Sequence, residues 1–292
     1  MPRGDTEKPM PPLVKIRSSR DQMSAIERRI ADFILDNAHL LRDYSSQQLA
    51  SALGVSQSSV VKFSQKLGFK GYPDLKYSIG EAVARASGSA AEQRPAEHDE
   101  DDAYTRLDLS LRRAKAAAEE ETRLINPRAT IERIAGLIDG APKVFVCGIG
   151  DDGLFAREFA MRLSLLGVLT VHHADAILMA SNFSAARAGD VLLMFSEFGQ
   201  LPALSQLARQ FRNSGGKVVS ITRHNANPLR AQADAALAIS AHDPAPQVEQ
   251  LLYRSSLQYL LDFLFVLLCR TNPERDRQLA MNLERVNQLL DA

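Results

Sequence analysis

Apolar residues recur at helical spacing early in the chain. Between Arg20 and Asp43 they stand mostly three or four positions apart, and charged residues fill the other face. These apolar positions are Met23, Ile26, Ile30, Phe33, Ile34 and Leu41. The pattern predicts one amphipathic helix over this stretch.

Two short helices with a tight turn are predicted next. Ser45 and Ser46 offer N-cap oxygens to a first helix that stops at Gly54, and Ser56 caps a second helix over 57–67. Glycine supplies the backbone freedom that the turn needs. The spacing is that of a helix-turn-helix, whose shared core would consist of Leu49, Ala50, Leu53, Val55, Val60, Phe63 and Leu67.

The polar positions of the second helix then lie on its outer and N-terminal surface, where a recognition helix reads the major groove. The residues expected to contact DNA are Ser56, Gln57, Ser58, Ser59, Lys62, Lys66 and Lys70. The side chains at 57–59 and Lys62 would reach base edges, while Lys66, Lys70 and Lys76 would reach phosphates. The alternative is a helical hairpin whose polar residues are merely solvated.

The rest of the chain alternates between short apolar runs and helical stretches. The runs lie at 144–147, 168–171, 191–195, 218–221 and 236–239, and two helices separated by Pro127 precede them. This alternation predicts a doubly wound, parallel five-stranded α/β sheet with a ligand crevice at the carboxyl ends of its strands. A last apolar stretch, 251–269, is predicted to be a helix packed on the sheet or on a partner subunit. Its broad apolar face carries Leu257, Leu260, Leu261, Leu264 and Leu268.

Charge is distributed unevenly along the chain, although the formal net charge is zero. Residues 1–85 hold 13 Lys and Arg against nine Asp and Glu, a basic balance that suits nucleic acid but also an ordinary surface. Residues 86–103 hold one Arg against six acidic residues, as expected of a solvated linker. We therefore predict an all-α DNA-binding domain at 1–85, a flexible acidic linker at 86–103 and an α/β domain at 104–292.

The composition also bounds the cellular setting. The two cysteines, Cys147 and Cys269, lack metal-ligand spacing, and the apolar run before Cys269 is bracketed by Asp262 and Arg270. The first residues carry charges and prolines rather than the apolar core of a signal peptide. We expect a cytoplasmic protein without a membrane-spanning segment.

A glycine-rich loop, GIGDDG at 148–153, follows the first strand and fits the G-x-G-x-x-G pattern of dinucleotide-binding proteins, with Asp175 further on. Asp151 and Asp152, however, would stand at the helix N-terminus where a pyrophosphate would bind, and like charges repel. We expect no nicotinamide or flavin cofactor.

Two further groups of polar residues could form a site. His172 and His173 are neighbours in a strand and point to opposite faces, so they are poor joint ligands and no metal site is expected. Glu249 and Arg254 precede the long final helix, where they could close the crevice or form a surface ion pair.

The segments VSQSSVVKF at 55–63 and KLGFKGYPDLK at 66–76 strongly resemble the N-terminal domain of the RpiR family of bacterial transcription regulators. The resemblance covers residues 15–85. It implies a DNA-binding helix-turn-helix that ends in an L-G-F-x-G-[FY] segment. Gly68 and Gly71 would end the recognition helix and turn the chain.

Residues 130–270 resemble a sugar isomerase (SIS) domain, the usual C-terminal partner in that family. The resemblance implies that phosphosugars bind in the loops after the first and third strands. The expected effector-binding residues are Gly148, Gly150, Asp151, Asp152, Ser196, Glu197, Phe198, Gly199 and Gln200. In the second loop, Phe198 and Leu201 replace two phosphate-binding hydroxyls of the family's S-x-S-G-x-T motif.

These departures predict a ligand other than an ordinary phosphosugar. The carboxylates could accept hydrogen bonds from ligand hydroxyls or pair with a cationic amine, while Phe198 packs on an apolar face of the ligand. The alternative is a vestigial pocket in a domain that serves only to oligomerise.

The sequence thus predicts a transcription regulator that binds a double-stranded DNA operator and whose SIS-like domain senses a sugar-derived or other small metabolite. A two-fold operator favours a homodimer or homotetramer. The alternative function is a sugar-phosphate isomerase or nucleotide-binding enzyme with an accessory helical domain. Isomerisation needs a positioned base and a held phosphate, and the sequence shows no convincing version of both, so we expect no enzyme activity.

Overall fold

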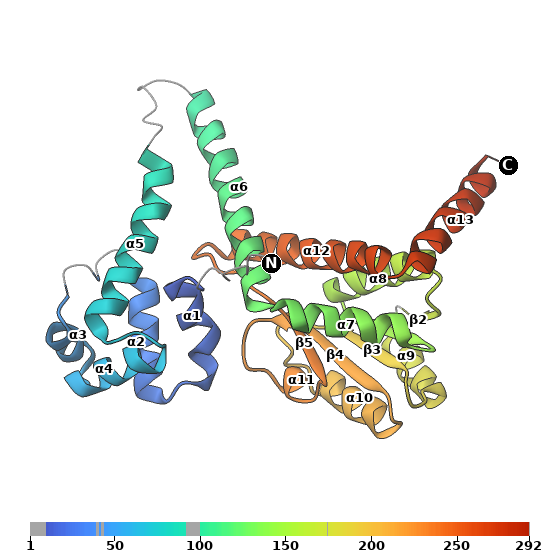
Figure 1. The fold of residues 1–292 in the computed structure, drawn as a ribbon, viewed down its shortest axis with the longest axis horizontal. Coiled ribbons are helices and arrows are strands. Elements are labelled where there is room, and N and C mark those ends of the chain that lie inside the picture. The colour runs from blue at the N-terminus through green and yellow to red at the C-terminus, as the bar shows by residue number, and fades with distance from the viewer. Residues whose placement is uncertain (1–9, 39–40, 42–43, 92–99, 174, 292) are drawn as a thin grey trace, which may run out of the picture. The chain divides into compact units, whose positions relative to one another are not determined.

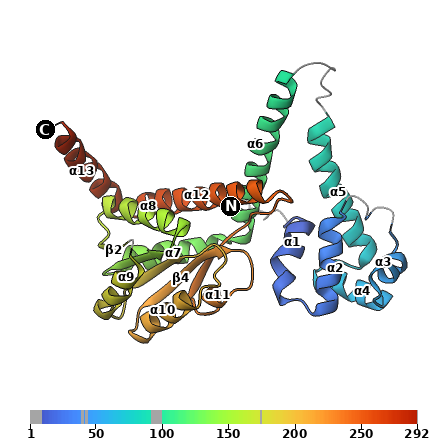
Figure 2. The ribbon, with the colours of Figure 1, turned by 180° about the vertical axis from the view of Figure 1, so that it is seen from behind.

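The structure is a computed structural model that describes residues 10–38, 41, 44–91, 100–173 and 175–291. Its backbone divides into two compact units, Met1–Leu107 and Asp108–Ala292. Figures 1 and 2 show the helices of the first unit from blue to cyan and the α/β elements of the second from green to red.

The described part of the first unit is helical. Its elements are α1 (Pro12–Ser19), the 3-10 helix η1 (Arg20–Gln22), α2 (Ala25–Asp36), α3 (Ser46–Leu53), α4 (Gln57–Lys66), α5 (Tyr72–Ala91) and the first residues of α6 (Glu100–Ile125). The single helix expected between Arg20 and Asp43 is therefore wrong, because α2 covers only its middle and α1 precedes it.

Ser24 explains why α2 starts where it does. Its hydroxyl accepts a hydrogen bond from the Glu27 N–H, and the Glu27 carboxylate accepts one from the Ser24 N–H, which makes a capping box. The apolar positions continue across this break, since Met23 and Ile30 are both buried in the same core. Because the apolar pattern continues without interruption, the pattern alone did not indicate that α2 starts only at Ala25.

The helix-turn-helix forms as the sequence predicts. Gly54 adopts φ 58° and ψ 40°, the left-handed conformation that turns the chain from α3 toward α4. Ser45 caps α3 and Ser56 caps α4, each through its hydroxyl. Leu49, Ala50, Val60, Phe63 and Leu67 are buried between the helices.

The segment expected to be a flexible linker, 86–103, is helical at both ends. Helix α5 continues to Ala91 and α6 begins at Glu100, while residues 92–99 lie outside the described residues.

The second unit is a three-layer α/β sandwich. Five parallel strands are arranged in the order β2-β1-β3-β4-β5. They are β1 (Val144–Gly148), β2 (Thr170–His172), β3 (Val191–Phe195), β4 (Lys217–Arg223) and β5 (Ala235–Ile239). The helices after α6 are α7 (Arg128–Gly140), α8 (Asp151–Leu165), α9 (Ala176–Asn182), the 3-10 helix η3 (Phe183–Ala185), α10 (Pro202–Asn213), α11 (Pro228–Ala231), α12 (Pro246–Thr271) and α13 (Pro273–Leu290).

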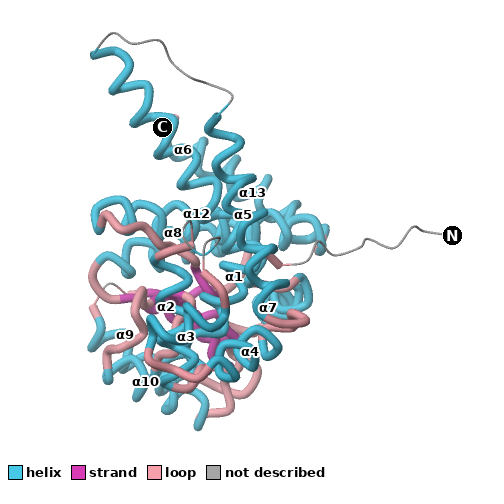
Figure 3. The backbone as a smooth tube through the Cα atoms, turned by 90° about the vertical axis from the view of Figure 1, so that its left-hand side faces the viewer, coloured by secondary structure: helices cyan, strands magenta, loops and turns pink. Residues whose placement is uncertain are grey.

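Each face of the sheet is covered by its own helices, and Figure 3 shows the strands as the inner layer. Helices α7, α8 and α12 cover one face and bury residues such as Ile134, Phe159 and Leu260. Helices α9, α10 and α11 cover the other face around Phe145, Phe183 and Phe211, whose rings meet edge to face. Burial on both faces explains why the inner strands β1 and β3 are continuously apolar in sequence.

Helix α12 belongs to this core. The five leucines of its predicted apolar face are at most 1% exposed, packed against the sheet and its helices. They are Leu257, Leu260, Leu261, Leu264 and Leu268, and their burial decides between the two packings left open above. The same helix is long and apolar enough to cross a membrane by length and composition, with a mean hydropathy of 1.4, although the sequence analysis expected no such segment. Its burial in the α/β core explains that composition.

Candidate functional site

Helix α4 presents a polar face opposite its buried one. Val60 and Phe63 are at most 1% exposed, whereas Gln57, Ser58 and Lys62 are exposed. Ser56, Ser59 and Lys66 lie on the same helix or at its cap, and Lys70 is exposed just after it. The side chains that the sequence analysis assigned to DNA therefore share one accessible region of the first unit.

The start of α4 is held by local hydrogen bonds. The Gln57 amide nitrogen donates to the Ser46 hydroxyl across 2.9 Å, which ties the two helices together at their N-termini. The Ser56 hydroxyl accepts from the Ser59 N–H at 3.1 Å and lies 2.8 Å from the Ser58 and Ser59 hydroxyls. Gln57 is thus exposed and yet restrained.

Lys66 has an acidic partner that the sequence did not indicate. Its Nζ lies 2.9 Å from both carboxylate oxygens of Glu27 on α2. The Ser24 backbone N–H, and then Lys66, hold the pKa of Glu27 below its ordinary value. An acidic side chain therefore lies next to a lysine expected to bind phosphate.

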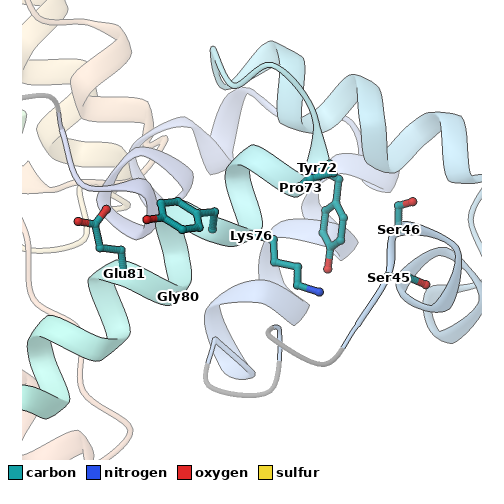
Figure 4. Close-up of a pocket in the computed structure, with 8 residues that line it drawn as sticks. Ser45, Ser46, Tyr72, Pro73, Lys76, Gly80 and Glu81 are labelled. Carbon is teal, nitrogen blue, oxygen red and sulfur yellow. The ribbon is translucent and has the colours of Figure 1, made fainter.

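A hollow of about 710 Å³ opens beside the N-terminus of α3 (Figure 4). Its walls are Ser45, Ser46, Tyr72, Pro73, Lys76, Tyr77, Gly80 and Glu81. The Lys76 ammonium and the Tyr72 hydroxyl both donate to the Tyr44 carbonyl at 3.1 Å, and burial raises the pKa of Tyr72 to about 12. Lys76, expected to reach a phosphate, is thus engaged within its own unit.

In the second unit, the loops after β1 and β3 lie side by side. Gly148 at the end of β1 pairs in register with Phe195 at the end of β3, at the point where the strand order reverses. A Cβ at Gly148 would come within 2.6 Å of the Asp152 carbonyl oxygen, so glycine permits the close start of α8. Gly150 has φ 65°, which glycine adopts without strain.

The two aspartates of the first loop have different surroundings. Asp151 pairs with Arg254 at 2.6 Å, both partly exposed. Asp152 Oδ2 accepts the Glu197 N–H across 2.9 Å. Burial, together with the charges of Glu197 and Asp151, raises the pKa of Asp152, although the Glu197 N–H and the Tyr253 hydroxyl act in the opposite direction.

Arg223, at the end of β4, joins the third-strand loop to α12. Its Nη2 and Nε donate to Glu197 Oε1 at 2.6 and 2.8 Å, and its Nη1 lies 2.9 Å from Glu249 Oε1. Nη1 also donates to the Ala241 carbonyl at 3.1 Å. The guanidinium is fully engaged, and its side chain is 12% exposed.

Two aromatic rings flank this guanidinium. Its carbon lies 5.2 Å from the ring centre of Phe198 and 5.4 Å from that of Tyr253. Tyr253 is 2% exposed, and its hydroxyl favours the ionised form of Asp152. Phe198 is 54% exposed in the loop after β3.

The rest of the third-strand loop is fixed by its neighbours. The Ser196 hydroxyl accepts the Gly199 N–H at 3.2 Å, so it closes the turn. Gly199 has φ 62°, and a Cβ there would overlap the Asn227 amide. Gln200 and Leu201 are exposed beside Phe198.

All nine predicted effector-site residues therefore lie either between the end of β1 and the first turn of α8 or in the adjacent loop after β3. Sequence reasoning weighed Glu249 and Arg254, which do form ion pairs with crevice residues. It missed Arg223 and Tyr253, because they come from β4 and from the interior of an apolar helix. Charged residues directly after a buried strand are the signal that could have indicated Arg223.

Two further features of the α/β unit bear on its chemistry. The His172 Nδ1 atom lies 2.9 Å from the Val146 carbonyl oxygen, within the sheet. Among the described residues, no group of three or more His, Cys, Asp and Glu side chains is arranged to hold a metal ion.

Known protein families match both units of the chain. Residues 10–86 match the family model of the rpiR-family helix-turn-helix domain, and residues 137–266 match that of the SIS domain. A relative from Escherichia coli (strain K12), the uncharacterised HTH-type transcriptional regulator YfhH, is 31% identical over 269 residues, or 91% of this chain and 95% of its own.

Solved structures share the fold. The Vibrio vulnificus NanR protein complexed with ManNAc-6P matches with a TM-score of 0.58 and 22% identity, over 95% of this chain and 98% of its own. The sugar isomerase domain of an RpiR transcription factor from Sphaerobacter thermophilus matches with a TM-score of 0.54 and 19% identity, over 63% of this chain and 99% of its own.

Proposed function

Because the chain belongs to the RpiR family of helix-turn-helix transcription regulators, we propose that α4 reads its operator and that the crevice of the SIS unit binds the effector. The exposed polar face of α4, opposite a fully buried one, carries this proposal. Gln57, Ser58, Ser59 and Lys62 would contact base edges, and Lys66 and Lys70 phosphates, while Ser56 holds the start of the helix.

The restraint on Gln57 supports its role in base readout. A side chain already held by Ser46 loses less conformational freedom when it binds. Glutamine can bond to adenine through both its amide oxygen and its amide nitrogen, and lysine suits guanine. Lys66 would contribute less than Lys70, because Glu27 competes with phosphate for its ammonium group.

The test begins with operator selection. Genomic DNA fragments retained by the purified protein are sequenced, and affinities are measured for the wild type, Gln57→Ala, Lys70→Ala and the control Gln210→Ala, which alters an exposed glutamine of α10. Gln57→Ala should cost about 1 to 3 kcal/mol and relax preference at one base position. Lys70→Ala should weaken all sequences alike and lower the salt slope by about one. Unchanged sequence preference in Gln57→Ala would contradict this orientation of α4.

In the second unit, we propose that a sugar-derived or other small metabolite binds between the loops 148–153 and 196–201 and alters DNA affinity. The position at the switch point of the sheet supports this. Phe198 and Leu201 present no hydroxyls to a phosphate, unlike the family motif. The unit binds its ligand and does not convert it, and the regulator acts in the cytoplasm.

We also propose that the regulator is a homodimer or homotetramer. One helix-turn-helix covers few base pairs, so two copies on a two-fold operator give the specificity that a regulator needs. On the outer side of α12, Phe263 and Val266 are 45% and 51% exposed, and on α8 Leu154 and Met161 are 65% and 61% exposed. These side chains are the apolar surface that a second copy would cover.

A further inference from the structure

One side-chain hydrogen bond joins the first turns of α3 and α4. The Gln57 amide nitrogen donates to the Ser46 hydroxyl oxygen across 2.9 Å, although the two residues are 11 positions apart. Each is the first residue of its own helix. The two helices are fixed to each other by a core that includes Ala50, Val60 and Phe63. The Ser46 hydroxyl is therefore held at a fixed place next to the exposed start of α4.

Ser46 is not needed to cap its own helix. Two adjacent serines stand at the start of α3 (Figure 4), and Ser45 caps it through a capping box with Gln48. Among the described residues, Gln57 is the one hydrogen-bond partner of the Ser46 side chain. The Ser46 hydroxyl thus acts on Gln57 and not on the helix N-terminus.

This bond divides the donors of the Gln57 amide. A side-chain amide has one acceptor oxygen and two N–H donors, and Ser46 accepts one of these donors. Among the described residues, none bonds to the amide oxygen or to the second N–H. Because Gln57 is exposed, its side chain presents one acceptor and one donor to the surroundings of α4.

One acceptor and one donor match adenine in the major groove and mismatch guanine. Adenine offers the N7 acceptor and the N6 donor, whereas guanine offers two acceptors, N7 and O6. While Ser46 retains one N–H, the amide can bond to both groups of adenine, but its oxygen would face guanine O6 without a proton between them. A Gln57 side chain released from Ser46 could turn both N–H groups toward guanine.

We propose that Ser46 is a positioning residue for base readout, which holds the Gln57 amide in the orientation that selects adenine over guanine at one operator position. This rests on the proposed function, because it names the residue that sets the specificity of the same helix. Ser46 acts through Gln57 and contacts no base itself. Its removal therefore changes which base is preferred and leaves the contacts of the other α4 residues in place.

The test compares base preference in the full-length protein. Operator fragments are selected from genomic DNA, and the position read by Gln57 is the one at which Gln57→Ala relaxes the preference. Affinities are then measured for operators with adenine and with guanine at that position. The wild type should prefer adenine by about tenfold or more. Ser46→Ala should lower this preference by about threefold to tenfold and leave the affinity for non-specific DNA unchanged.

Further variants separate positioning from a structural role. Ser46→Thr keeps a hydroxyl and should retain the preference to within about twofold. Ser45→Ala removes the cap of α3, so it should lower the melting temperature and leave the preference unchanged. Ser46→Ala should leave the melting temperature unchanged, because water replaces an exposed hydrogen-bond partner. In the Gln57→Ala background, Ser46→Ala should have no further effect on base preference.

Five outcomes would overturn the inference. Two concern the preference itself, namely a wild-type preference for a base other than adenine and an unchanged preference in Ser46→Ala. The others are an equal loss in Ser45→Ala, an equal loss in Ser46→Thr, and a loss in Ser46→Ala that persists without the Gln57 side chain. If Gln57→Ala relaxes one position and Ser46→Ala does not, the role of Ser46 alone is refuted. If Gln57→Ala relaxes no position, the proposed orientation of α4 fails, and this inference fails with it.

Discussion

Glu27 serves two purposes at the surface of the DNA-binding unit. Its carboxylate completes the capping box that starts α2, and it also pairs with Lys66 of α4. Glutamine can replace glutamate in a capping box. The charge of Glu27 can therefore be removed while its role at the helix N-terminus is kept.

We predict that Glu27→Gln increases affinity for all DNA sequences alike, by about twofold to fivefold at low salt, because it frees Lys66 and removes a negative charge near the phosphates. Filter binding at two salt concentrations checks this, and the gain should shrink at the higher one. Exposed ion pairs contribute little, so the free energy of unfolding should change by less than about 1 kcal/mol. A uniform loss of affinity would instead mean that Glu27 positions Lys66 for its phosphate.

Asp152 gives the α/β unit a pH dependence of defined sign. Its pKa in the folded protein is raised above the ordinary value of 3.8, so its contribution to stability is fully present at pH values below 3.8 and is lost as the pH rises through the folded-state pKa. Asp152→Asn removes this penalty. The variant should therefore melt higher than the wild type at neutral pH, with the difference vanishing in acid.

Thermal melts across the acid range test this, with about 2 to 4 °C expected per kcal/mol in a chain of this size. Glu132→Gln controls for the loss of a charge. A variant that is less stable than the wild type at pH 7 would show that the hydrogen bond from Glu197 outweighs the burial of the carboxylate.

At this scale, sequence spacing predicted which side chains would share a surface but could not predict their partners. The register of one amphipathic helix places Gln57 and Lys62 on its polar face. Glu27 and Arg223 reach the two sites from other elements, and no local periodicity encodes such long-range contacts. Tyr253 was missed because a buried tyrosine in an apolar helix looks like any other core residue.

Among the loops, the turn after β3 depends on a single glycine. Gly199→Ala should destabilise the protein by about 1 to 3 kcal/mol, since φ is 62° and the added Cβ would overlap the Asn227 side chain. Denaturant unfolding measures this. The matched control is Gly136→Ala at an exposed position of α7, where nothing lies within 4 Å of the added Cβ. That change should stabilise by about 0.5 to 1 kcal/mol. Equal effects of both substitutions would show that the turn tolerates a side chain.

Elements were predicted best where a hydrophobic run had clear ends. The limits of β3 were predicted correctly, because Val191–Phe195 is fully buried and flanked by polar residues. Strand β2 begins at Thr170 rather than Val168, since the Val168 N–H still bonds to Leu163 in the turn after α8. Helix α1 was missed because its short sequence, PLVKIRSS, follows several prolines and lacks a long amphipathic period.

For the whole molecule, the proposed interface between copies lies on the exposed side of α12, because the leucines on its other side are buried within the chain. We predict that the full chain sediments as a dimer or tetramer at micromolar concentration and that the double variant Phe263→Glu, Val266→Glu shifts it toward the monomer. The charges would lie in the proposed interface and face water otherwise, so the fold should persist. Leu289→Glu, 79% exposed on α13, is the control. Unchanged sedimentation of the double variant would exclude this surface.

The ion pair between Glu249 and Arg223 would let α12 transmit a movement of the crevice along its length. Its first turn is fastened to the crevice, and its 26 residues form a rod about 39 Å long. A tilt of about 3° at the fastened end would displace the far end by about 2 Å, a typical amplitude for a helix shift in a switching protein. A small tilt at the crevice would thus become a larger displacement at the end of α12 that adjoins α13. Paired spin labels on α13 and α7 should therefore report a distance change when ligand binds, and Glu249→Gln should diminish it.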